Sequence, residues 1–166
     1  MAAQQGTVRF HHEGPTLLLQ VEGWATMKQS LPLRRFMDQN LSGQTKTVWV
    51  DLSQCTYLDS TFLGTLLFVQ RTCTRLGDRE FSLLSPSVPC LSLLQQMGVI
   101  DVFQIRAMEA SAPPCWTELT KETEDKPGLQ RTVIQAHEEL ARLPGAAGEP
   151  FRAVVRCLEK EMEKRQ

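Results

Sequence analysis

The sequence predicts an α/β fold, because segments typical of strands alternate with segments typical of helices over most of the chain. Residues 47–52 are apolar and β-branched almost throughout, as in a strand buried on both faces of a largely parallel sheet. Residues 61–76 then carry apolar side chains at helical spacing and end at Gly77. A length of 166 residues suits one compact domain with a helical extension.

The N-terminal residues suit a β-hairpin. Segments 7–10 and 16–22 have strand-like patterns, and Glu13, Gly14 and Pro15 fit the turn between them, because Gly and Pro favour turn geometry. We expect this hairpin to lie at the edge of the sheet.

A helix is expected after Gly23, with Thr26 as its N-terminal cap. Pro32 removes one backbone hydrogen bond from this helix, so either the regular helix begins near Ser30 or its first turn is distorted. The buried face would carry side chains spaced three and four residues apart, at Leu33, Phe36, Met37 and Leu41.

The central strand leads through the turn Asp59-Ser60-Thr61 into a helix that Gly77 would close in a left-handed conformation. A strand over 81–84, a short helix over 90–97 and a strand over 102–105 follow, with right-handed crossovers between parallel strands. The inner stripe of the long helix would consist of Leu63, Leu66, Leu67, Gln70 and Cys73.

The composition changes at Ala110, where residues 110–128 lose periodicity and gain prolines and acidic groups. We therefore divide the chain into a domain over 1–109, a linker over 110–128 and a C-terminal helical extension over 129–166. The extension is expected to hold two helices, over 129–143 and 150–164. The second has an apolar stripe that either packs back on the domain or forms a homodimer or partner contact, at Phe151, Val154, Val155, Leu158 and Met162.

Charge and cysteine usage exclude several functional classes. The net charge is −1, from 18 basic and 19 acidic residues without a long single-sign run, so we expect no direct binding of nucleic acid. No segment has the roughly 18 uninterrupted apolar residues of a membrane span, so we expect no membrane insertion. The five scattered cysteines lack a CxxC pair and indicate reduced thiols in a cytoplasmic protein.

The sequence lacks the GxSxG, GxxxxGK[ST], GxGxxG and HExxH patterns of common hydrolases, nucleotide-binding proteins and metalloproteases. We therefore expect no enzyme activity, no cofactor and no metal site. His11 and His12 would point to opposite faces of a strand, which argues against a shared metal. His137 lies in an amphipathic helix, where an interfacial residue is favoured over a catalytic base.

The turn Asp59-Ser60-Thr61 places two hydroxyls at the start of a helix. The first turn of a helix has unpaired backbone N–H groups and a partial positive charge, so Ser60 is either a cap or a place to hold a phosphate. A cap contributes roughly 0.5 to 2 kcal/mol without any signalling role. The residues alone favour the cap.

The order of these elements resembles a STAS domain, the domain of bacterial anti-sigma factor antagonists. The resemblance covers roughly residues 7–108, and its most specific parts are the turn Asp59-Ser60-Thr61 and residues 93–103, LLQQMGVIDVF. It implies a mixed β-sheet of four to five strands with helices packed mainly on one face. The C-terminal helices would follow this domain.

The resemblance also implies a phosphorylation switch that controls a sigma factor. An anti-sigma factor serine kinase would phosphorylate Ser60, the unphosphorylated domain would bind that kinase and free the sigma factor, and a phosphatase would reset the switch. Asp59 would be an acidic recognition residue and Thr61 a kinase contact or secondary site, with Phe62 and Gly64 completing the partner-binding surface. A Gly is common in the family where this chain has Phe62, so Phe62 would either block a standard kinase or anchor a different one.

Two other interpretations stay open. Similar domains act as non-switching scaffold subunits of signalling assemblies or of lipid-transport ABC systems, and Phe62 together with the amphipathic C-terminal helices favours this interpretation. A small-ligand or nucleotide-binding domain has no support from particular residues.

Overall fold

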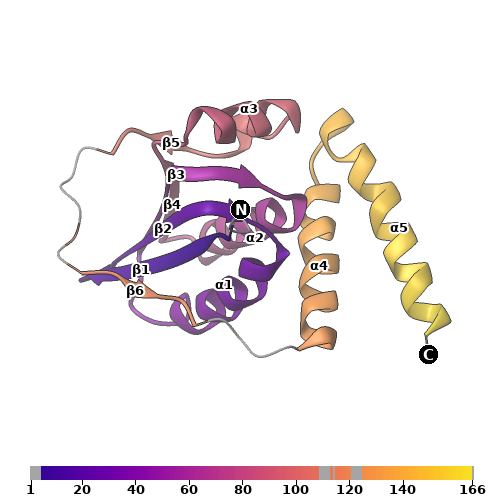
Figure 1. Ribbon diagram of the computed structural model, residues 1–166, viewed down its shortest axis with the longest axis horizontal. Helices are drawn as coiled ribbons and strands as arrows, with labels where there is room; N and C mark the ends of the chain where they lie inside the picture. The colour runs from indigo at the N-terminus through magenta and orange to yellow at the C-terminus, as the bar shows by residue number, and fades with distance from the viewer. Residues whose placement is uncertain (1–4, 109–112, 114, 121–124, 166) are drawn as a thin grey trace.

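The computed structural model describes residues 5–108, 113, 115–120 and 125–165. One sheet has the strand order β5-β4-β3-β2-β1-β6, and α-helices cover it and extend beyond it (Figure 1). The strands are β1 (Thr7–Glu13), β2 (Thr16–Ala25), β3 (Thr47–Leu58), β4 (Glu80–Leu84), β5 (Ile105–Arg106) and β6 (Thr117–Glu118). The helices are α1 (Met27–Asn40), α2 (Ser60–Leu76), α3 (Val88–Gln96), α4 (Lys126–Ala141) and α5 (Glu149–Lys164).

The sheet is mixed, as expected. β1 and β2 form the antiparallel hairpin, and Gly14 at its turn has a φ of +57°, a conformation that glycine adopts without steric cost. β2, β3, β4 and β5 run parallel to one another. The α/β class predicted from the alternating pattern is therefore confirmed.

The sheet has six strands rather than the four to five expected. The sixth, β6, pairs antiparallel with β1 through Phe10 and Thr117, and it comes from the segment predicted as a linker. The N-terminal hairpin consequently does not lie at the edge of the sheet, and that prediction was wrong. A strand of two residues is too short to give a periodic sequence signal.

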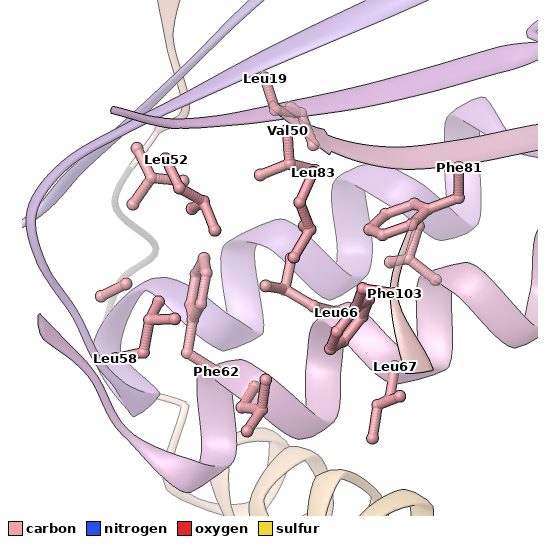
Figure 2. Close-up of a cluster of buried hydrophobic side chains, with 14 of the residues drawn as sticks. Leu19, Val50, Leu52, Leu58, Phe62, Leu66, Leu67, Phe81, Leu83 and Phe103 are labelled. Atoms are coloured by element: carbon pink, nitrogen blue, oxygen red, sulfur yellow. The ribbon is translucent and has the colours of Figure 1, made fainter. Parts of the chain in front are cut away.

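Helices α1 and α2 pack on one face of the sheet. Alternate residues of the parallel strands are fully buried on that face, including Leu17, Leu19, Val48 and Val50. Figure 2 shows side chains of the sheet and of α2 meeting in this core, with Phe62 and Leu66 on the helical side. Helices mainly on one face, as the family resemblance implied, are thus observed.

Helix α1 begins at Met27, immediately after the predicted cap Thr26. The Thr26 hydroxyl accepts a hydrogen bond from the Lys28 N–H, and the Gln29 side chain accepts one from the Thr26 N–H at 2.9 Å, which completes a capping box. The helix therefore does not begin near Ser30, and it continues through Pro32.

Helix α2 ends as predicted, because Gly77 adopts a φ of +81° and donates its N–H to the carbonyls of Cys73 and Thr74. The strand expected over 102–105 differs from the structure. A 3₁₀ turn (Ile100–Val102) precedes the two-residue strand β5, which pairs with β4.

The C-terminal helices lie beside the domain. Helix α4 packs against α2 and α1, while α5 lies on the outer side of α4 and contacts it rather than the sheet (Figure 1). Both helices begin earlier than expected, at Lys126 and Glu149.

Candidate functional site

Asp59 caps helix α2. Its Oδ1 atom accepts a hydrogen bond from the Phe62 N–H at 2.8 Å, and its Oδ2 atom accepts one from the Met27 N–H, also at 2.8 Å. One carboxylate therefore satisfies orphan donors at the starts of both α1 and α2. Because Asp59 supplies the cap, the hydroxyl of Ser60 is left for another partner.

That partner is His137 of α4. Ser60 Oγ lies 3.0 Å from Nε2 of His137, and Nδ1 of the same ring lies 2.7 Å from the carbonyl oxygen of Val133. A carbonyl only accepts hydrogen bonds, so Nδ1 carries a proton and donates it to Val133, which leaves Nε2 to face the Ser60 hydroxyl. Ser60 is half-buried, and His137 is 7% exposed.

A close backbone contact lies one turn further along α2. A Cβ atom added to Gly64 would lie only 2.1 Å from the carbonyl oxygen of Ala136 in α4. Only glycine permits this approach without displacing backbone, so the residue at position 64 lets the two helices meet. A glycine inside an otherwise good helix was the one sequence signal of this contact.

Ionic contacts hold the same helix pair beyond the glycine. The Arg71 guanidinium donates to the Glu139 carboxylate at 2.5 Å and to the Glu139 carbonyl at 2.7 Å. Arg142 donates to the other carboxylate oxygen at 3.0 Å. Glu139 is 8% exposed, and its charge is compensated by Arg71 and by the more exposed Arg142.

The first turn of α4 is tied to α1. Asp125 caps α4 by accepting the Gly128 N–H at 2.9 Å, and its carboxylate pairs with Arg35. These contacts hold the pKa of Asp125 below its ordinary value, the Gly128 N–H first and Arg35 second. The capping carboxylate is therefore ionised at neutral pH and contributes to docking.

The structure places the other candidate residues away from the surface. Thr61 is buried, and the Phe62 side chain is fully buried in the core, where Figure 2 shows it among residues of the sheet. Gly64 is buried under α4. Phe62 is thus a packing residue in this arrangement rather than an exposed anchor, and a direct part in partner binding stays a prediction for it and for Gly64.

The contact between Ser60 and His137 was not predicted, since the sequence identified His137 only as an interfacial residue. These residues are 77 positions apart, and nothing in local periodicity links them. Within the residues that the structure describes, no group of three or more His, Cys, Asp or Glu side chains is placed to hold a metal. None of the helices in the described ranges combines the length and the apolar character needed to cross a bilayer.

Comparisons with known proteins agree on the domain. A family model described as "Mlab, STAS domain" matches residues 8–106, so α4 and α5 lie outside the matched segment. No curated protein sequence matches the chain significantly.

Solved structures with the same architecture include the anti-sigma factor antagonist SpoIIAA in its unphosphorylated form. It has a TM-score of 0.54 and 16% identity, over 61% of this chain and 87% of that one. The Bacillus cell fate determinant SpoIIAA in the phosphorylated form gives a TM-score of 0.52 and 16% identity, over 61% and 90% of the two chains.

An anti-sigma factor antagonist from Mycobacterium paratuberculosis gives a TM-score of 0.52 and 18% identity, over 63% of this chain and 87% of its own. At such identities the likeness establishes the fold. The family model, in turn, spans more than half of the sequence, from β1 through β5. A mixed sheet with two helices on one face, a capped α2 and a sequence that fits the family model together establish that the chain belongs to the STAS domain family.

Proposed function

We propose that this protein is an anti-sigma factor antagonist that binds a protein partner and is controlled by phosphorylation of Ser60. The observation that carries the proposal is the position of Ser60 as the first residue of α2, with the capping role supplied by Asp59. The Ser60 hydroxyl can therefore be modified while the cap stays in place. The partner would be a cytoplasmic serine kinase of the anti-sigma factor type, with a phosphatase to reset the site.

The chemistry of a phosphate at Ser60 supports a switch. A phosphate adds about −1.5 to −2 charges at neutral pH, and the acidic residue Asp59 is its neighbour in sequence. A partner surface that is acidic or closely packed would be repelled. The N-terminus of a 17-residue helix favours anions, so the domain itself would tolerate the modification.

The protein would act by binding rather than by catalysis. A Ser–His pair resembles an activated nucleophile, but here it lies in a contact between two helices, and His137 is almost fully buried. A substrate would have to displace α4 before it could reach the Ser60 oxygen.

Phosphopeptide mapping tests the proposal. The protein is incubated with ATP and Mg²⁺ in its native cytosol, and the peptide that contains Asp59-Ser60-Thr61 is analysed by mass spectrometry. We expect one phosphate on this peptide, its loss in Ser60→Ala and its retention in Thr61→Val. An unmodified peptide, in an extract that phosphorylates other substrates, would rule out the switch.

A second candidate function is a non-switching scaffold subunit of a signalling assembly or a lipid-transport ABC system. Helix α5 favours it, because Val154 and Met162 are 38% and 36% exposed on a helix whose apolar stripe only partly meets α4. Met162 also lines an apolar groove between α4 and α5, together with Leu129, Val133 and Leu158 among others. A stable oligomer by light scattering that Met162→Glu dissociates, with Arg156→Glu as the control, would support the scaffold.

A further inference from the structure

Helix α4 lies on the face of α2 that carries Ser60. Three residues of α2 define this face, namely Ser60, Gly64 and Arg71. Gly64 and Arg71 follow Ser60 by four and eleven positions, so all three lie on one stripe of the helix. Each is engaged by α4, through His137, Ala136 and Glu139 respectively.

We infer that α4 is an intramolecular occupant of the partner-binding face of α2, so that a kinase or other partner reaches Ser60 only after α4 has moved away. The identity of this face as the partner site rests on the proposed function. The occupancy itself rests on contacts within the chain.

The contacts are specific to α4 rather than those of an accidental neighbour. The hydroxyl of Ser60 shares a hydrogen bond of 3.0 Å with His137. The backbones of α2 and α4 approach so closely that a methyl group at position 64 would collide with the backbone of Ala136. The charge of Arg71 is compensated by a nearly buried carboxylate. Hydrogen bond, shape and charge are therefore complementary along one stripe.

Occupancy conflicts with modification at the same position. A kinase must surround the acceptor hydroxyl with its own catalytic groups, which requires the side of Ser60 that α4 covers. Phosphate at Ser60 would in turn place a dianion at the partly buried contact where the Ser60 hydroxyl now shares a hydrogen bond with His137. The docked helix and the phosphorylated serine are therefore competing states of one site, and phosphorylation should leave α4 displaced.

Thiol protection in the full-length chain tests the occupancy without a kinase. The exposed thiols are removed by Cys115→Ser and Cys157→Ser, and the remaining cysteines are buried. Into this background we place Ser60→Cys, or Thr56→Cys as the control at an exposed position outside the contact. The rate of modification by a polyethylene glycol maleimide is then followed by gel shift.

We expect the thiol at position 60 to react at least about tenfold more slowly than the thiol at position 56, because a bulky maleimide needs more room than the docked α4 leaves around the half-buried position 60. Gly64→Ala should accelerate the reaction several-fold by excluding the Ala136 backbone. Glu139→Ala should do so from a residue that does not touch Ser60, and it serves if Gly64→Ala does not fold. Equal rates at positions 60 and 56, or no acceleration in either folded variant, would overturn the inference.

Phosphopeptide mapping of Gly64→Ala and Glu139→Ala, each made in the chain that keeps Ser60, separates the two proposals. Faster labelling together with faster phosphorylation of Ser60 supports both. Faster labelling without any phosphate in an active extract leaves α4 as the occupant and removes the phosphorylation switch.

Discussion

The hydroxyl of Ser60 and the imidazole of His137 share a hydrogen bond of 3.0 Å, although Ser60 belongs to the STAS domain and His137 to the helix that follows it. The contact makes the C-terminal extension part of the site. His137, which the sequence identified only as an interfacial residue, is thus the hydrogen-bond partner of the candidate phosphoacceptor.

Replacing His137 should destabilise the docked extension. His137→Ala removes the hydrogen-bond partner of a partly buried hydroxyl and leaves a gap beside α2, so we expect a loss of about 1 to 3 kcal/mol in the free energy of unfolding. His12→Ala, at an exposed position, should change stability by less than about 0.5 kcal/mol. Urea titration followed by circular dichroism measures both, and equal stabilities would contradict the geometry.

Phe62 should behave as a core residue. Its side chain has 0% exposure, so Phe62→Ala should cost about 3 to 5 kcal/mol through lost apolar burial and the cavity left behind. Phe151→Ala, at a half-buried position on α5, is the comparison and should cost clearly less. If thermal unfolding ranked the two variants in the opposite order, Phe62 would belong to the surface after all.

The cap of α4 should respond to acid. The pKa of Asp125 is lowered by the Gly128 N–H and by Arg35, so its contribution to stability is complete above the unfolded value of about 3.9 and is lost as the pH falls through the folded value. Asp125→Asn keeps a capping side chain but removes the charge. The stability difference between the two proteins should be constant near neutral pH and shrink below about pH 4.

Denaturation curves at several pH values measure this difference. Asp38→Asn serves as a control for an exposed carboxylate of α1. A difference that grew with acidification would reverse the sign and refute the assignment.

The cysteines should separate by burial. Burial raises the pKa of Cys73 to about 11, with Arg79 opposing, so this thiol stays protonated near pH 8. Iodoacetamide should therefore modify the exposed Cys115 and Cys157 in the folded protein and the three buried thiols only after unfolding. Intact-mass analysis before and after adding urea gives the number of labels, and early labelling of Cys73 would show that α2 is more open than described.

Local rules predicted much of the fold. The caps Thr26 and Gly77 and the inner stripe of α2 follow from side-chain chemistry and spacing within one helix, and the structure has them in these places. Gln70 in that stripe is only half-buried, and its amide donates to the Val102 carbonyl at 2.6 Å. Spacing identified the face of the helix but not this polar role.

Long-range features were beyond the same rules. The short strand β6 has no periodicity, and an amphipathic stripe predicts that a helix buries one face without naming what covers it. Phe62 was interpreted as a block or an anchor for a kinase because it stands where the family commonly has a Gly, whereas its side chain is fully buried in the core. The contact between Ser60 and His137 depends on how α4 packs against α2. The local sequence of neither helix determines that packing by itself.

The pairing of β6 with β1 has a consequence for competition at Ser60. Only residues 119–124 separate β6 from the cap Asp125. A detached α4 would therefore stay tethered near α2, at an effective concentration on the order of millimolar. Its return is a first-order process that dilution of the protein does not slow. A partner protein therefore has to compete with the tethered α4 for the same face of α2. Partners that bind weakly or are present at low concentration would not displace α4 and would not reach Ser60.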